Sequence, residues 1–333
     1  MIVLVFCLCY IVSVLYNVGN GKLRAIQMKY RIYINKYHKG IIVFIACIMF
    51  ICVFSACSGI SEVNLPVVDD YEYDEVTEIV NLKVGVVSGP YGDMFKEAIL
   101  PSLEEMGYSA SFSYYNDYSS PNVALAQNEI DLNIFQHYTY LNSFKFEHNL
   151  ALTAIMEIPT VSMGIFSNSI KSLDDIKNGI AVSVPDDSSN LARALWVLES
   201  ANVISLDPFI DKSKAVVSDI ISNPYNMRII PMKAHELVQS LDVFDVSVVN
   251  GNYAISGGLY LPDALYQEVL VENYINVIAV RTDDLTKQFV RDIIDIIYSN
   301  EFCDVVTDPE GKYVGFQWPR WLSDAVSDTG GKH

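Results

Sequence analysis

Apolar positions follow two alternating patterns along the chain from Leu82 onward. Short runs rich in β-branched and aromatic residues predict strands. These runs are LKVGVV (82–87), SASFSYY (109–115), LNIFQH (132–137), IPTVSMGIFS (158–167), GIAVSVP (179–185), MRIIPM (227–232), DVSVVNG (245–251) and YINVIAVR (274–281). Between several of them, apolar residues recur every three or four positions, which predicts helices. This alternation is typical of an α/β protein with mostly parallel sheets, and about 250 residues suit two lobes better than one.

Several of the predicted helices carry recognisable signals. The helix over 95–106 contains Pro101, which should kink it because proline lacks the N–H of a helical hydrogen bond. Pro121 opens a short helix, since proline suits a first turn. The run DDSSN at 186–190 supplies capping residues before a longer helix, and the segment 283–300 has the apolar periodicity of an amphipathic helix.

The first 57 residues predict a targeting segment rather than part of the fold. Two apolar runs, 1–16 and 41–56, flank a basic stretch, and neither reaches the roughly 20 residues of a membrane-spanning helix. From Met28 onward, the chain has a basic stretch, then an apolar stretch, and then small residues before Cys57. This is the order of a secretory signal with a lipobox. We therefore expect Met28 as the working start and Cys57 as the lipidated residue; a short membrane anchor is the alternative.

Charge then separates the segment after Cys57 from the body. Residues 58–80 contain seven acidic residues and no basic one, so we expect 58–81 to be an acidic tether. The whole chain has 40 acidic against 22 basic residues, a net charge of -18. Nucleic acid is therefore excluded as a partner, because its phosphates need a basic surface.

Motifs for catalysis or cofactor binding are missing from the sequence. It contains no G-x-S-x-G, P-loop, G-x-G-x-x-G or H-E-x-x-H pattern. Cys303 is the one cysteine after Cys57, and the histidines lack metal-ligand spacing. We therefore expect no enzyme activity, no cofactor and no metal.

Polar and aromatic residues gather where predicted strands end, which is where open α/β sheets bind ligands. The segments are YYNDYSSPN (114–122), FQHYTYL (135–141) and DDSSNLAR (186–193). Arg193 falls in the predicted first turn of a helix, where a cation is unfavourable unless an anion lies between it and the helix end. A ligand carboxylate could be that anion; pairing with Asp186, Asp187 or Glu199 is the alternative. The other end of a small ligand could bind in an apolar box of aromatic side chains. The candidates for this box are Tyr118, Phe135, His137 and Tyr140.

Several segments together resemble the NlpA-type methionine-binding lipoproteins, the substrate-binding components of methionine ABC importers. They occur in the same order from about Leu82 to Arg281: VGVVSGP, YNDYSSPNVAL, IDLNIFQHYTYL, IPTVSMGIFS, SVPDDSSNLARAL, VVNGNYA and NVIAVR. The resemblance implies a two-lobed type II periplasmic-binding fold with crossover strands. Lobe 1 would contain residues 82–163 plus 252–333, and lobe 2 residues 164–251.

The same resemblance implies the ligand-binding residues. NLAR matches the family's carboxylate-binding segment through Asn190 and Arg193, and VVNGNYA brings in Asn250 as a partner of the amino-acid head group. His137 and Tyr140 would form walls of the side-chain pocket, and NDY matches the family through Tyr118. The chain departs from many members at Tyr91, where a histidine is common, and at Gly251-Asn252.

The implied protein is a lipid-anchored, extracytoplasmic binding protein that captures methionine, or a related amino acid or methionine dipeptide, and delivers it to an ABC permease in the cell membrane. The departures leave the ligand open among these. The same fold acting as a surface sensor or adhesin without a permease is the alternative.

Overall fold

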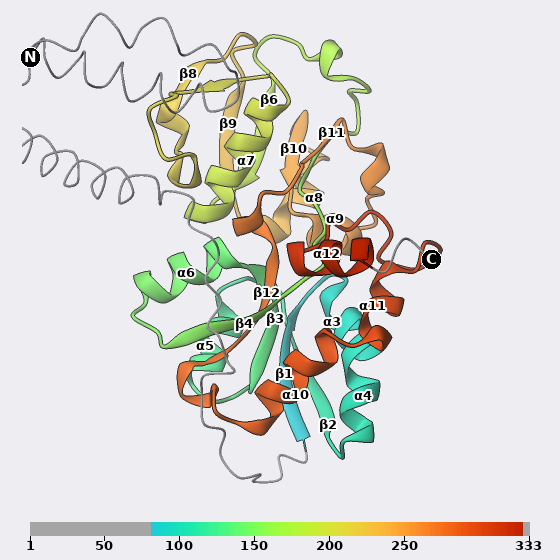
Figure 1. Cartoon of the computed structure of the whole chain (residues 1–333). Coiled ribbons are helices and arrows are strands. Elements are labelled where there is room, and N and C mark those ends of the chain that lie inside the picture. The colour runs from blue at the N-terminus through green and yellow to red at the C-terminus, as the bar shows by residue number, and fades with distance from the viewer. Residues whose placement is uncertain (1–80, 329–333) are drawn as a thin grey trace, which may run out of the picture. The chain divides into compact units, whose positions relative to one another are not determined.

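The computed structural model describes residues 81–328, coloured in Figure 1. The expected signal and lipobox (1–57), with Met28 and Cys57, lie outside the described residues, as does the expected tether up to residue 80. None of the helices between residues 81 and 328 is both long and apolar enough to span a membrane.

The first lobe is built on a five-stranded sheet in the order β2-β1-β3-β12-β4. The strands are β1 (Asn81–Val87), β2 (Ser109–Tyr115), β3 (Leu132–His137), β4 (Leu152–Ile158) and β12 (Asn276–Arg281). β1 pairs in parallel with β2 and β3, whereas β12 runs antiparallel between β3 and β4. The chain therefore returns to this lobe after the second one, and β12 is inserted between β3 and β4.

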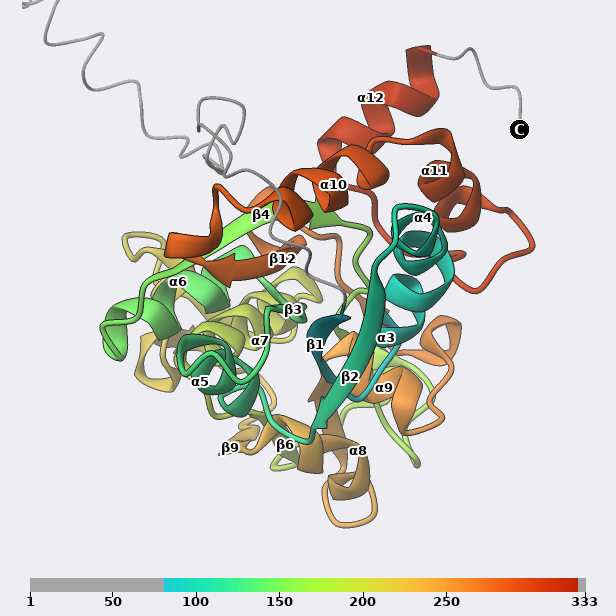
Figure 2. The same ribbon diagram turned by 90° about the horizontal axis from the view of Figure 1, so that it is seen from below.

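Helices cover both faces of this sheet (Figure 2). On one face lie α3 (Tyr91–Met94), α4 (Leu100–Glu105), α10 (Gln288–Ile297) and α11 (Asn300–Thr307), followed by α12 (Arg320–Asp328). On the other lie α5 (Ser120–Ala126) and α6 (Tyr138–Glu147). The predicted amphipathic helix in 283–300 is confirmed as α10, which buries Phe289, Ile293 and Ile297 against the sheet.

The expected kink at Pro101 takes the form of a π-helical turn at Phe95–Ile99, between α3 and α4. Pro101 is the second residue of α4 and has no N–H for the carbonyl four residues before it. A wider turn before a proline lets the helix continue without that bond. The interruption therefore precedes the proline.

The second lobe contains a five-stranded sheet in the order β11-β5-β10-β6-β9. Its strands are β5 (Gly164–Phe166), β6 (Ala181–Pro185), β9 (Arg228–Met232), β10 (Val246–Val249) and β11 (Tyr266–Gln267), and its helices are α7 (Ser188–Ser200), α8 (Leu237–Ser240) and α9 (Gly251–Ser256). A two-stranded sheet of β7 (Ser205–Leu206) and β8 (Ile220–Ser222) lies beside them. β6 pairs in parallel with β9 and β10, as the alternating pattern predicts.

Two crossover segments join the lobes. The long strand predicted at 158–167 is wrong: β4 already ends at Ile158, and residues 159–163 run between the sheets before β5 begins. Pro159 cannot donate a ladder hydrogen bond, and the backbone of Thr160 pairs with Gln317 instead of with the backbone of a strand in either sheet. The return crossover lies at 268–275, later than the position near 252 predicted from the sequence, because β11 still pairs with β5 in the second sheet.

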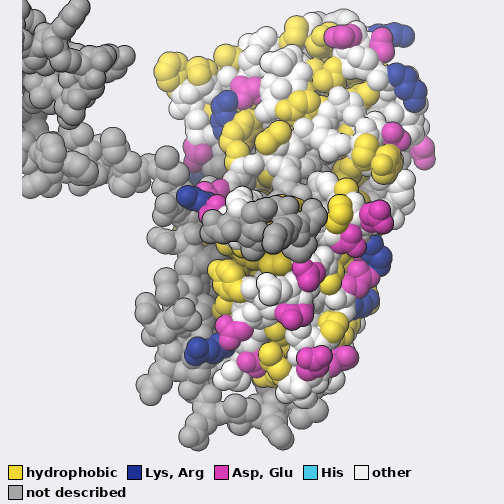
Figure 3. Space-filling model, turned by 45° about the vertical axis from the view of Figure 1, so that its right-hand side comes forward, with side chains coloured by type: hydrophobic (Ala, Val, Ile, Leu, Met, Phe, Trp, Pro, Cys, Tyr) yellow, Lys and Arg dark blue, Asp and Glu magenta, His cyan; other side chains and the backbone are white. Residues whose placement is uncertain are grey.

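Each lobe has its own apolar core, and a third apolar cluster is shared between them. The shared cluster packs Phe135, Tyr140 and Phe144 of the first lobe against Phe166 and Tyr253. All five side chains are buried. The two lobes are therefore in contact along the cleft. On the face seen in Figure 3, acidic and basic side chains are scattered over both lobes rather than gathered into one patch.

Candidate ligand-binding site

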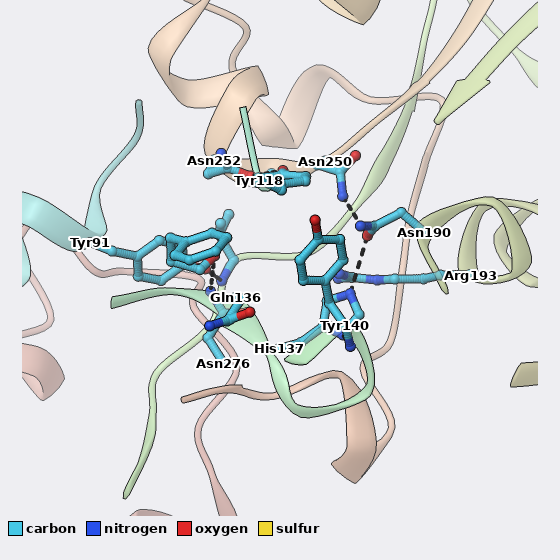
Figure 4. A pocket seen from close by; sticks show the side chains of 13 residues that line it. Tyr91, Tyr118, Gln136, His137, Tyr140, Asn190, Arg193, Asn250, Asn252 and Asn276 are labelled. Atoms are coloured by element: carbon cyan, nitrogen blue, oxygen red, sulfur yellow. Dashed lines mark hydrogen bonds between the residues drawn. The ribbon is translucent and has the colours of Figure 1, made fainter. Parts of the chain in front are cut away.

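A small pocket lies between the lobes, where strand ends and helix starts from both sheets meet (Figure 4). The lining residues are Tyr91, Tyr118, Phe135, Gln136, His137, Tyr140, Val161, Asn190, Arg193, Asn250, Gly251, Asn252 and Asn276. The pocket is therefore assembled from segments that are up to 185 residues apart in the chain.

All seven residues predicted from the sequence as ligand-binding line this one pocket: Tyr118, Phe135, His137, Tyr140, Asn190, Arg193 and Asn250. The structure also places Tyr91, Gly251 and Asn252, the positions of departure from the family pattern, on its wall. Gln136, Val161 and Asn276 also line the pocket and were not predicted as ligand-binding residues. Gln136 lies within FQHYTYL at the end of β3, and Asn276 is the first residue of β12, in a segment that indicated no site.

Three aromatic rings form one wall. Tyr118 stacks on Phe135 with ring centroids 5.8 Å apart, and Tyr140 meets Tyr118 edge-on at 5.6 Å. Phe135 and Tyr140 also contact each other edge-on, at 6.3 Å. Such offset and edge-to-face pairs are the preferred arrangements of aromatic side chains, and they hold the rings in place. This wall is suited to an apolar ligand side chain.

A second, polar wall is a series of hydrogen bonds that starts at the beginning of α7. Asp187 caps the helix by accepting from the Asn190 backbone N–H at 2.9 Å, and its carboxylate also accepts from Asn190 Nδ2. This contact orients the Asn190 amide, so its Oδ1 faces the pocket. Asn190 Oδ1 accepts from Asn250 Nδ2 at 2.7 Å and lies 3.2 Å from His137 Nε2.

His137 is a neutral member of this series. Its Nδ1 accepts from the Tyr140 backbone N–H at 3.0 Å, so the ring proton belongs on Nε2 and is donated to Asn190. Burial, helped by the charge of Arg193, lowers the pKa of His137 to about 3. The imidazole is therefore an uncharged part of the wall at physiological pH.

The last member of this hydrogen-bond network, Asn250, has an acceptor oxygen to which no described residue donates. Asn250 gives its Nδ2 to Asn190, and its Oδ1 is buried with no hydrogen-bond partner within residues 81–328. Leaving such an oxygen unpaired costs about 1–3 kcal/mol. A donor group on a bound molecule would satisfy it.

Arg193 lies in the second turn of α7, not in the first as predicted, because the helix begins at Ser188. The alternative pairing with Asp186, Asp187 or Glu199 is also wrong. Asp187 caps the helix, while Asp186 pairs with Lys233 and Glu199 with Lys212.

Arg193 instead forms a buried ion pair with Glu268, just after β11. The two side chains are only 5% and 8% exposed. Glu268 was missed because it stands 75 residues from Arg193, in a segment without a motif. Within residues 81–328, no group of three His, Cys, Asp or Glu side chains could hold a metal ion.

Two α/β lobes joined by crossover segments, with a pocket between them, define the type II periplasmic-binding fold. The model of the NlpA lipoprotein family matches residues 82–321, and the chain belongs to this family.

Known proteins of several bacteria are similar to it. The D-methionine-binding lipoprotein MetQ of Escherichia coli K12 is 31% identical over 66% of this chain and 82% of its own length. A nutrient-binding protein from Burkholderia cenocepacia, solved bound to methionine, is 32% identical, with a TM-score of 0.64 over 68% of this chain and 95% of that one. An ABC transporter periplasmic substrate-binding protein from Coxiella burnetii is 33% identical, with a TM-score of 0.63 over 68% and 96% of the two chains.

Proposed function

We propose that the chain is a lipid-anchored, extracytoplasmic substrate-binding protein. It captures methionine, or a closely related amino acid or methionine dipeptide, between its lobes and delivers it to an ABC permease. One observation carries the proposal: a single pocket joins a guanidinium and an unpartnered amide oxygen to a wall of aromatic rings. The names of the relatives support methionine as the ligand and a transporter as the partner.

The aromatic wall favours a thioether side chain. Burying the two methylenes and the methyl group of methionine contributes about 0.8 kcal/mol each. The sulfur gains a further contact with ring edges, and the unbranched chain adapts to a narrow pocket. Tyr118, Phe135 and Tyr140 would make these contacts.

The polar wall favours the amino-acid head group. The ligand ammonium donates to Asn250 Oδ1, a buried acceptor that has no donor among residues 81–328. The ligand carboxylate accepts from Arg193, which has N–H groups not used by Glu268. Pairing both charges offsets the cost of removing a zwitterion from water.

Capture between lobes suits delivery to a permease. Residues of both lobes line the pocket, so the ligand stabilises the closed arrangement, and a partner can recognise that arrangement. Cys57 would carry the lipid that holds the protein at the outer face of the cell membrane. No step of this role requires a catalytic group or a cofactor.

Calorimetry with the detergent-solubilised full chain tests the ligand. We expect L- or D-methionine to bind more tightly than leucine or alanine. At a hundred times its dissociation constant, methionine should add about 2.7 kcal/mol to the free energy of unfolding. The matched control is 4-(methylthio)butanoate, which lacks the ammonium group and should bind at least roughly tenfold more weakly, because Asn250 Oδ1 stays unpaired. Absence of binding by any methionine derivative would reject the proposal.

A further inference from the structure

The guanidinium of Arg193 is held by one of its edges. Its Nε lies 2.8 and 3.1 Å from the two Glu268 carboxylate oxygens, and its Nη2 lies 2.6 Å from Oε2. Glu268 therefore occupies the side of the guanidinium formed by Nε and Nη2. The ring of Tyr274 packs over its face, with Cζ 5.2 Å from the ring centroid.

This arrangement leaves the end of the guanidinium available. An arginine carries five N–H groups in a fixed plane, and Glu268 uses one on Nε and one on Nη2. The remaining three are on Nη1 and Nη2, and these two nitrogens form a second edge that can bind a carboxylate bidentately. Arg193 lines the pocket, and in Figure 4 its side chain extends from α7 toward His137 and Tyr140.

Glu268 is itself fixed by both crossover segments. Its Oε2 accepts from the Met163 backbone N–H at 3.0 Å, and its own backbone N–H donates to the Met163 carbonyl, also at 3.0 Å. Gln317 donates to the Glu268 carbonyl at 2.9 Å and to Ser162 Oγ at 2.6 Å. A carboxylate anchored at so many points gives Arg193 little freedom to rotate.

We propose that Glu268 is a positioning residue, which orients Arg193 so that its free edge receives the ligand carboxylate. The inference rests on the proposed amino-acid-binding function and adds a residue that the sequence did not indicate. It also specifies how Glu268 acts. Its negative charge by itself repels a ligand carboxylate, so a purely electrostatic role would reduce the preference for carboxylates, whereas a positioning role increases it.

The two roles predict opposite results for Glu268→Gln. The glutamine side chain has one acceptor oxygen, and its NH₂ group faces N–H donors, so it cannot hold the guanidinium and Met163 N–H together. We expect the preference for methionine over methionine amide, measured by calorimetry with the detergent-solubilised full chain at pH 7, to fall at least roughly tenfold. The matched control is Glu157→Gln, a buried carboxylate on β4 that does not line the pocket, and it should leave the preference unchanged.

An unchanged or larger preference in Glu268→Gln would overturn the inference. If Glu268→Gln gives no cooperative thermal melt, Glu268→Asp replaces it, because it keeps the charge but withdraws the carboxylate by one methylene. The same loss of preference is then expected, and an unchanged preference again overturns the inference. Failure of the unaltered chain to bind methionine would instead refute the proposed function, so the two failures are distinguishable.

Discussion

Replacing Arg193 by methionine should destabilise the protein much more than the ion pair itself stabilises it. The substitution leaves the Glu268 carboxylate buried, at 8% exposure, without the guanidinium that now donates to both of its oxygens. Removing one partner of a buried pair costs about 3–5 kcal/mol, because the other charge remains out of water. For a domain of this size, that corresponds to a fall in melting temperature of about 6–20 °C.

The double substitution Arg193→Met/Glu268→Met should recover most of this loss. It removes both charges and fills the space with apolar side chains, an exchange that is often neutral in other proteins. The Met163 backbone N–H then lacks its acceptor, which costs about 1–3 kcal/mol. Urea unfolding of the ligand-free chain and its three variants gives the coupling free energy, which we expect to exceed about 2 kcal/mol. Additive losses in the two single variants and the double variant would refute the idea that the pair acts as a unit.

Two other substitutions separate ligand contacts from stability. Tyr140→Ala should weaken methionine more than alanine in calorimetry, because the Tyr140 ring is part of the aromatic wall; equal losses would place it outside the side-chain pocket. Burial and the nearby charge of Glu272 raise the pKa of Glu157 to about 7, so its contribution to stability is present below about pH 4.5 and is lost as the pH rises through 7. In urea unfolding, the free energy of unfolding of Glu157→Gln should therefore exceed that of the unaltered chain by about 3 kcal/mol at pH 8 and equal it at pH 4. Free energies of unfolding that differ by the same amount at both pH values would contradict this.

Local patterns predicted most of the elements but not how they connect. The strands at 82–87, 109–115 and 132–137 and the amphipathic helix in 283–300 are confirmed, because alternation and helical periodicity reflect burial by the nearest sheet. The segment 158–167 was read as one strand because an extended crossover and a buried strand have the same apolar composition. What distinguishes them is the identity of the hydrogen-bond partners, which lie far away in the chain.

The candidate site shows the same limit. The residues at the strand ends and a resemblance to a known family together indicated seven residues that line one pocket. Glu268 carried no signal, since an isolated glutamate after a two-residue strand is usually a solvated side chain, and its role depends on a contact across 75 positions. The turn in which Arg193 lies was also mistaken, because the helix start was placed a few residues too late.

Helix α9 ties the two halves of the molecule together at the pocket. It follows β10 of the second sheet directly, yet Asn252 bonds to Tyr118 and to the Ser88 carbonyl, and Tyr253 to the Asn116 carbonyl. Any separation of the sheets must either break these three bonds or swing the short link at Asn250 that leads into the helix. In the second case the amide of Asn250 moves with respect to Asn190. The NMR resonances of the Asn190 and Asn250 amide groups would then report the opening of the two lobes, without any added probe.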